Sequence, residues 1–312
     1  MRAPASRWLL LVTVLALAVG GALLLGPAGW DPGIVWDLRA PRVLLGVLVG
    51  AALAVAGVIF QALLRNDLAE PYLVGVGPGA ALGVTLAAWL AGAQALPSAA
   101  TRSLAAFLGA VGVAVLVFAG ARRAGRTSAA TLVLSGVALG LLVQALATGM
   151  LYVAVPRWDL VMQWLLGHLV GSAWLDALPV GSALLLGLCV AAWRARELDA
   201  LTLGEDAAWL VGVDARRTLL WLGAVGCLLA ATAVATAGLV GFVGLVVPHL
   251  ARRVVGAGHR SLLPASALLG GALLVLADAL ARVLCPPLEI PPGLVTAAVG
   301  APVLLVLLLR RA

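Results

Sequence analysis

The chain has 312 residues, of which 63% are apolar and 11% are charged. This composition excludes an ordinary soluble domain and indicates a polytopic membrane protein, because a surface solvated by lipid does not need the usual charged coat. The net charge is +7, but the basic residues sit at the ends of apolar spans rather than in one stripe, which argues against a nucleic-acid-binding surface. All 20 basic side chains are Arg. Since a phosphate-cradling P-loop needs Lys, any ATP hydrolysis that drives this chain must belong to another polypeptide.

Ten apolar segments approach the roughly 20 residues that a transmembrane helix needs. The expected fold is an all-α integral membrane protein, with one bundle of about ten transmembrane helices that occupies residues 1–312 as a single domain. The first segment follows Arg2 and Arg7 and imitates a signal peptide, but more spans follow at once, which favours an uncleaved helix. The spans are predicted at 8–27, 43–64, 72–92, 103–121, 129–153, 178–194, 218–237, 240–255, 262–281 and 294–309.

The placement of Arg predicts the orientation in the cytoplasmic (inner) membrane. With a cytoplasmic N-terminus, 15 Arg residues lie in cytoplasmic segments and 5 lie on the other side. This bias supports an even number of spans with both termini in the cytoplasm. Merging the seventh and eighth spans into one would move every later loop to the opposite side of the membrane and remove the bias in Arg placement. This supports a break between two helices near Ala237-Gly238. The outer set is Arg39, Arg42, Arg102, Arg157 and Arg282.

Two connections between spans are longer than a tight turn. Residues 154–177 lie outside and contain Trp158, Trp164 and Trp174, as expected of a segment at the membrane surface. Residues 195–217 lie inside and form an amphipathic, Gly-punctuated segment. There Gly204 precedes the acidic Glu205 and Asp206, which suit a first helical turn; Ala207, Ala208, Leu210 and Val211 offer an apolar face, and Gly212 ends the helix. This pattern predicts a short surface helix with one apolar side.

Ordered motifs run from about residue 37 to the C-terminus. They are Arg39-Ala40-Pro41-Arg42, Gly50 to Gly57 with Gln61, Asn66-Asp67-Leu68-Ala69-Glu70-Pro71, Ser135 to Leu139, Trp164-Leu165-Leu166-Gly167, Leu201 to Glu205, Leu210 to Val213, the Gly-rich run 237–253 with Pro248-His249, and Glu289 to Pro302. In type and order this set resembles the FecCD-type permeases of ABC importers for iron chelates, haem and cobalamin. Asp67 departs from the family pattern, which usually has Pro there, and Pro78 is expected to stiffen or kink the third span.

The resemblance implies a permease subunit that is not itself an enzyme and has no cofactor of its own, because ATP and Mg are bound by partner subunits. The implied partners are a second permease, in a homodimer or, as the alternative, in a heterodimer of related permeases, two cytoplasmic ATP-binding subunits and a periplasmic or lipid-anchored substrate-binding protein. It also implies that Arg39, Arg42 and Arg282 dock acidic residues of the binding protein, the alternative being anchors for lipid headgroups. The residues implied to couple the permease to the ATPase are Gly204, Glu205, Asp206, Ala207, Leu210, Val211 and Gly212.

Several polar residues lie within or beside the spans. Asp278 is expected to pair, and its i,i+4 spacing favours Arg282 as the partner; Glu289 is expected either to pair with Arg282 or to cap the next turn. For Gln61 and Gln144, hydrogen bonds between helices are the default, and a place along the substrate path is the alternative. The three His residues (His168, His249 and His259) and the three Cys residues (Cys189, Cys227 and Cys285) show no metal-binding spacing.

Two other function classes are weighed against an importer permease. A secondary transporter predicts ionisable residues at mid-membrane and internal repeats, but Asp278 is the only good candidate for such a residue and no repeat is evident. A membrane enzyme predicts clustered His or carboxylate residues at a membrane face, which the sequence does not have. The motifs do not separate ferric siderophore, haem and cobalamin as the substrate; siderophore ranks first as the expected commonest class, and a small oxyanion is a remote fourth.

Overall fold

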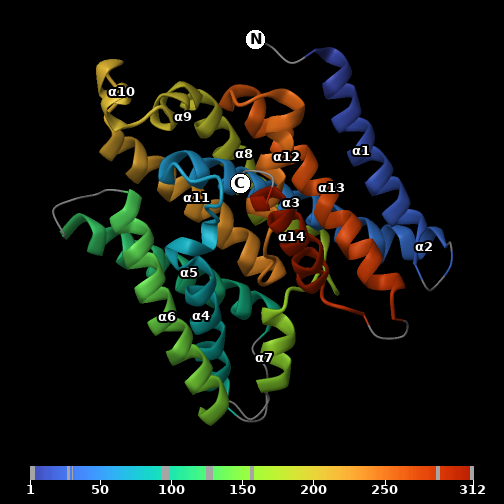
Figure 1. The fold of residues 1–312 in the computed structure, drawn as a ribbon. Coiled ribbons are helices and arrows are strands. Elements are labelled where there is room, and N and C mark those ends of the chain that lie inside the picture. The colour runs from blue at the N-terminus through green and yellow to red at the C-terminus, as the bar shows by residue number, and fades with distance from the viewer. Residues whose placement is uncertain are drawn as a thin grey trace.

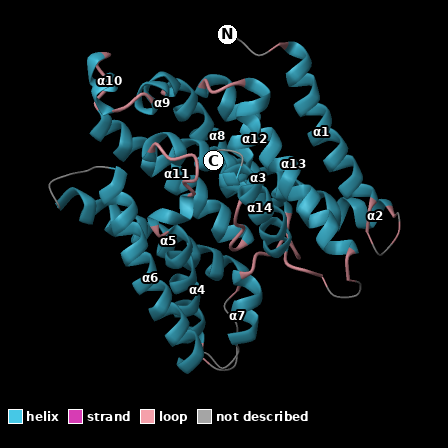
Figure 2. Ribbon diagram, viewed as in Figure 1, coloured by secondary structure: helices cyan, strands magenta, loops and turns pink. Residues whose placement is uncertain are grey.

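The computed structural model describes residues 4–26, 29, 31–92, 98–123, 129–154, 158–285 and 289–309, and these parts of the chain are helices joined by short loops (Figure 1, Figure 2). Arg2, Arg126, Arg157, Arg310 and Arg311, which enter the predicted charge bias, lie outside these ranges. The helices are α1 (Ala5–Leu24), α2 (Pro32–Ile34), the π-helical turn η1 (Val35–Arg39), α3 (Ala40–Leu64), the 3-10 turn η2 (Pro71–Val74), α4 (Val76–Ala91), α5 (Ala99–Arg123), α6 (Ala129–Ala154), α7 (Trp158–Leu165), the 3-10 turn η3 (Trp174–Asp176), α8 (Ala177–Trp193), α9 (Ala195–Thr202), α10 (Glu205–Leu210), α11 (Ala215–Ala237), α12 (Val243–Val255), α13 (His259–Val283) and α14 (Pro292–Leu309).

Ten of these helices correspond to the ten predicted spans, so the all-α fold is confirmed. Seven are long and apolar enough to cross a membrane unaided. The shorter ones include α4 and α12, of 16 and 13 residues. At 1.5 Å per residue, α12 is about 20 Å long, less than the roughly 30 Å of a hydrocarbon core. The predicted break after α11 is present, and Gly238 makes it with a φ of 71°.

The central helix of the bundle is α3, in which most residues are Gly, Ala or Val. Most of its length is buried, and it packs against α11, α12 and α13. Two close approaches depend on glycine. A Cβ added to Gly50 would collide with the carbonyl of Gly270 in α13, and one added to Gly57 would collide with the carbonyl of Gly244 in α12. Small residues at such crossings let helix backbones approach closely in membranes.

Replacing Gly57 by Ala is therefore expected to destabilise the bundle. The added methyl meets the backbone of Gly244, which cannot move aside as a flexible side chain does. Overpacking of this kind costs about 1–3 kcal/mol. The change in midpoint in a denaturant titration of the purified protein measures it. The matched control is Gly120→Ala, because a Cβ there meets no atom within 4 Å; equal midpoints for the two variants would contradict the close-packing argument.

The two long connections lie at opposite ends of the bundle. The helices α9 and α10 lie at the end where α1 begins, at the top of Figure 1, and α7 lies at the bottom. We call these the inner end and the outer end, after the predicted orientation. Pro78 falls in the first turn of α4, where it breaks no helical hydrogen bond, so it stiffens the entry to the helix without kinking it.

Candidate functional site

A buried ionic cluster joins α3 to α13 near the outer end. The Nε of Arg42 donates to both carboxylate oxygens of Asp278, at 3.1 and 3.0 Å, and its Nη2 donates to Oδ1 at 2.8 Å. Its Nη1 donates to Glu289 at 2.9 Å. Arg42 is only 9% exposed and Asp278 only 2%. Asp278 is paired, as predicted, and its partner Arg42 lies on a neighbouring helix. The Nε of Arg282 lies 3.3 Å from Asp278, as the i,i+4 spacing predicts, but Glu289 pairs with Arg42 rather than with Arg282.

The same cluster holds the C-terminal end of α1. The Nη1 of Arg39 donates to the carbonyl of Leu23 at 3.1 Å, and its Nη2 donates to that of Gly29 at 2.7 Å. Arg282 donates to the carbonyl of Ala22 at 3.0 Å. Cations at this end of a helix satisfy its last carbonyls and complement its dipole. The three predicted docking residues thus lie together at the outer end, but their side chains are buried and bonded within the chain. A docking role for them stays a prediction.

The predicted coupling segment, residues 195–217, folds as two short helices at the inner end. Gly204, with a φ of 113°, makes the bend between α9 and α10. Glu205 and Asp206 occupy the first turn of α10, as predicted, and Gly212, with a φ of 77°, follows the end of the helix. The apolar face differs in part from the prediction. Ala208 is buried against the bundle and Ala207 is half-buried, whereas Leu210 and Val211 project outward.

Three exposed apolar side chains dominate the tip of this segment. Leu210 is 78% exposed, and Trp209 and Leu203, which the sequence analysis did not single out, are 77% and 78% exposed. Exposed large apolar side chains outside the membrane-spanning helices are candidates for contact with a partner protein. A groove of about 630 Å³ runs beside them, lined by Glu205, Asp206, Trp209, Asp214 and Arg216 among others. The tip therefore has the features of a docking surface with an apolar centre and a charged rim.

Ion pairs and hydrogen bonds fix this tip to the bundle. Glu205 accepts from Arg65, the residue that follows α3, at 2.6 Å. Asp199 in α9 accepts from the backbone N–H of His259 at 3.0 Å and lies 2.6 Å from its Nδ1. Burial opposes the ionisation of Asp199, but these bonds from His259 prevail and lower its pKa. His259 is the first residue of α13. The coupling segment is thus attached to α3 and α13 together.

Of the two Gln residues, Gln61 ties α3 to α12. Its Nε2 donates to the carbonyl of Leu245 at 3.2 Å, and its Oε1 accepts from Arg252 at 2.7 Å. Arg252 also lies 3.5 Å from Asp67, the residue that replaces the family's Pro. Helix-to-helix bonding, the default reading, holds for Gln61. Gln144 is exposed on α6 and donates to Thr148 one turn away at 3.2 Å, and its place along a substrate path stays a prediction.

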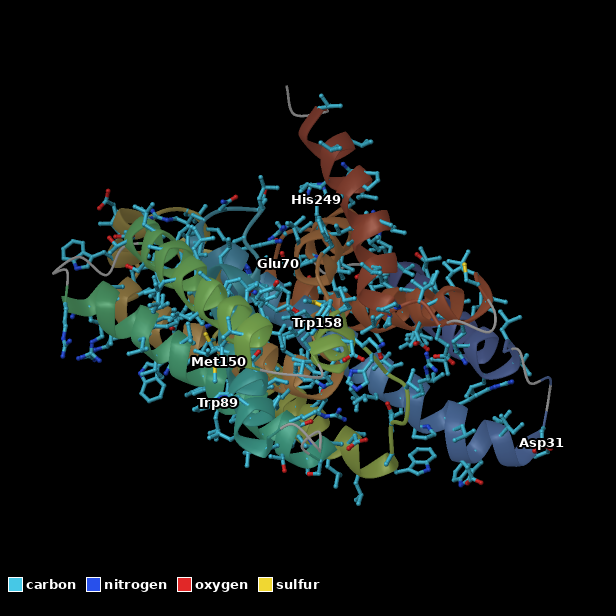
Figure 3. All side chains as sticks on the ribbon, turned by 90° about the horizontal axis from the view of Figure 1, so that it is seen from below. Asp31, Glu70, Trp89, Met150, Trp158 and His249 are labelled. Carbon is cyan, nitrogen blue, oxygen red and sulfur yellow. The ribbon has the colours of Figure 1, made fainter. Side chains whose placement is uncertain are left out.

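The break between α11 and α12 is held by two residues of the loop after α3. The carboxylate of Glu70 accepts from the N–H of Phe242 at 2.9 Å, and the hydroxyl of Tyr72 donates to the carbonyl of Val240 at 2.9 Å. Glu70 lies toward the middle of the molecule, whereas Asp31 lies at its edge (Figure 3). Phe242 has a φ of 67°, a conformation that costs energy for a bulky residue and that these bonds help to maintain. In the sequence Glu70 is one residue of the motif 66–71, and the motif does not indicate this bond to Phe242.

Within the described residues, no group of three or more His, Cys, Asp or Glu side chains is arranged to hold a metal ion. The three Cys residues are free thiols. The structure therefore offers two candidate sites, the buried cluster at the outer end and the exposed tip at the inner end.

Known proteins resemble this chain along most of its length. The model of the FecCD transport family matches residues 8–310. The chain is 44% identical to the cobalamin import system permease protein BtuC of Halobacterium salinarum, over 95% of this chain and 79% of that protein. It is 40% identical to the hemin transport system permease protein HmuU of Yersinia pestis, over 89% of this chain and 84% of that protein. Among solved structures, a metal-chelate type ABC transporter in an inward-facing conformation superposes with a TM-score of 0.87 at 31% identity, covering 97% of this chain and 98% of that one.

Proposed function

Since this chain belongs to the FecCD transport family of ABC-importer permeases, we propose that it carries an iron-chelate-type cargo, a ferric siderophore, haem or cobalamin, across the cytoplasmic membrane. The observation that carries the proposal is the family match along nearly the whole chain, 8–310. Membership in an importer family disfavours the secondary-transporter and membrane-enzyme readings. The cargo's identity within the three classes rests on similarity alone, because relatives with different cargoes match about equally well.

The energy for transport comes from partner ATPases, because the chain has no Lys for a phosphate-binding loop. The exposed tip of Leu203, Trp209 and Leu210 is the proposed contact with these subunits. A short helix can place such apolar anchors in a groove of a partner. The tip is attached to α3 through Arg65 and to α13 through His259. We expect these attachments to transmit a movement of the ATPase to both helices.

The proposed assembly is a two-fold dimer of permeases, the ordinary closed form for two copies. Support comes from α6, whose outward side exposes Leu134, Leu141 and Tyr152 and carries Gln144 among them. A substrate-binding protein is proposed to dock at the outer end. Arg39, Arg42 and Arg282 are already bonded within the chain, so the proposed docking role requires that an acidic side chain of the binding protein replace one of these bonds. Glu289 is the most exposed member of the cluster, at 39%.

Topology has a direct test. Reporter fusions after Ala195 and Ala312 are expected to report the cytoplasm, and one after Asp176 the opposite side, because 15 of the 20 Arg residues then lie inside. Phosphatase and fluorescent-protein reporters, read in parallel, measure the two sides. An external C-terminus would contradict an even number of spans.

The function is tested in proteoliposomes that hold the permease, its ATPase and its binding protein. ATP-dependent uptake of ⁵⁵Fe-siderophores, haemin and cyanocobalamin is measured separately for each compound. We expect uptake of at least one of them, and none when the ATPase is omitted. Failure of all three with a properly assembled complex would refute the cargo class.

A further inference from the structure

Two adjoining cavities open at the outer end, between the first turn of α5 and the segment that joins α7 to α8. The smaller, about 230 Å³, is lined by Arg102, Ser103, Trp164, His168, Ser172 and Asp176 among others. The larger, about 660 Å³, shares Arg102, Trp164 and His168 with it and extends to Arg42 and Glu289. Because they share these walls, we treat them together as the outer hollow.

Two nitrogen atoms in the outer hollow have no partner within the described part of the chain. They are the Nε of Arg102 and the Nδ1 of His168, and both are shielded from solvent. Burying a polar group without a hydrogen-bond partner is unfavourable, so few such groups are expected in a folded protein. The position of His168 is fixed all the same, because its backbone N–H donates to the carbonyl of Ala237 at 2.8 Å and Gly167 turns the chain with a φ of 88°.

None of the described ion pairs includes Arg102, the cation that both cavities share. Arg42 is neutralised by Asp278 and Glu289. Asp176 also lines the smaller cavity, but its carboxylate accepts from the N–H of Ala173 at 2.7 Å, and none of the described ion pairs joins it to Arg102. Burial, with Arg102 and Arg42 nearby, lowers the pKa of His168 to about 4, so its ring is neutral at physiological pH. Arg102 therefore supplies the cation, and His168 supplies a directional hydrogen bond.

We propose that the outer hollow binds a carboxylate or phosphate group of an anionic cargo, with Arg102 as the cation and His168 as the hydrogen-bonding partner. The planar guanidinium group matches the geometry of both oxyanions and holds them by paired hydrogen bonds. The smaller cavity has room for such a group, and the larger one has room for part of the body that bears it. The assignment of the ligand as cargo rests on the proposed function. In that function the outer end, where the hollow lies, is the end at which an importer receives its substrate.

Direct binding of inorganic phosphate to the purified full-length permease tests the site without any knowledge of the cargo. Line broadening of the ³¹P signal in detergent is expected to saturate. The Arg102→Gln variant is expected to weaken binding by about tenfold or more, as the loss of a charge-assisted pair implies, and Arg102→Lys by less. Asp176→Asn keeps an acceptor for Ala173 and removes a competing charge, so it should bind phosphate more tightly. The matched control is Arg123→Gln, on the exposed inner end of α5, which should bind as the wild type does.

Equal phosphate binding by the wild type and the correctly folded Arg102→Gln variant would overturn the proposal. Repeating the titration in nanodiscs of phosphatidylcholine and of phosphatidylglycerol distinguishes a site for cargo from a site for an anionic lipid headgroup. Phosphate binding lost only in phosphatidylglycerol assigns the site to a lipid headgroup and overturns the assignment to cargo.

Uptake assays separate this proposal from the proposed function. If a compound is imported and carries a carboxylate or phosphate, Arg102→Gln should raise its KM several-fold; an unchanged KM would overturn the proposal. If no tested compound is imported but phosphate binding still depends on Arg102, the proposed function fails and the oxyanion site stands.

Discussion

Replacing Asp278 by Asn is expected to destabilise the protein by about 3–5 kcal/mol, the usual cost of removing one partner from a buried ion pair. Asp278 is the shared carboxylate between Arg42 and Arg282, and all three side chains are buried. Asn has nearly the same volume, so packing is preserved and the loss is electrostatic. Two guanidinium groups then lie near each other, with Glu289 the only remaining carboxylate of the cluster and bonded to just one of them.

Denaturant or thermal unfolding of the detergent-solubilised protein measures this loss. The matched control is Glu289→Gln, which removes a carboxylate from the same Arg42 at a position 39% exposed. Because solvent screens that pair, its loss should cost about 1 kcal/mol or less. If Asp278→Asn is no less stable than Glu289→Gln, the cluster does not stabilise the bundle, and the burial argument is wrong.

Replacing Leu210 by Asp is expected to separate the permease from its ATPase while leaving the bundle folded. Leu210 is 78% exposed, so the change costs the isolated chain little. In an assembled complex the carboxylate would be buried without a partner in an apolar contact, at a cost of about 2 kcal/mol or more, or at least a thirtyfold loss of affinity. Co-purification of the ATPase and stimulation of ATP hydrolysis by the loaded binding protein are the measurements.

The matched control for this experiment is Leu210→Met, which keeps an apolar side chain of similar volume and should assemble normally. Normal assembly and uptake by Leu210→Asp would move the coupling surface elsewhere on the inner end. The next candidates are residues 65–71, which include the Arg65 partner of Glu205, and residues 252–260, which include the His259 partner of Asp199.

Contacts that follow from local spacing could be predicted from the sequence. Apolar runs predict the spans, and the placement of Arg predicts the break at Gly238. The acidic first turn predicts the helix that begins at Glu205, and the i,i+4 spacing predicts that Arg282 lies close to Asp278. Each of these depends on residues within one or two turns or on a count along the chain.

Contacts between distant segments could not be predicted in the same way. No local sequence pattern indicates that Glu289 pairs with Arg42 rather than with Arg282. Likewise, none indicates that the carboxylate of Glu70 accepts a hydrogen bond from the N–H of Phe242 across the bundle. Ala208 and Trp209 are adjacent in the chain, and only the fold shows that Ala208 faces the bundle whereas Trp209 projects outward. Arg102 and His168 were treated separately, and only the fold places them in one cavity.

The buried cluster also constrains the order of events during synthesis. Arg42 and Asp278 are 236 residues apart in the chain. At a ribosomal rate of 5–20 residues per second, about 10–50 s pass between the translation of α3 and that of its counter-charge. During that interval Arg42 has no acidic partner from α13, and its place near the outer end of α3 lets its long side chain reach the headgroup layer. We therefore expect the nascent α3 to reach its final depth in the membrane only after α13 is inserted. The last third of the polypeptide then completes the insertion of the first third.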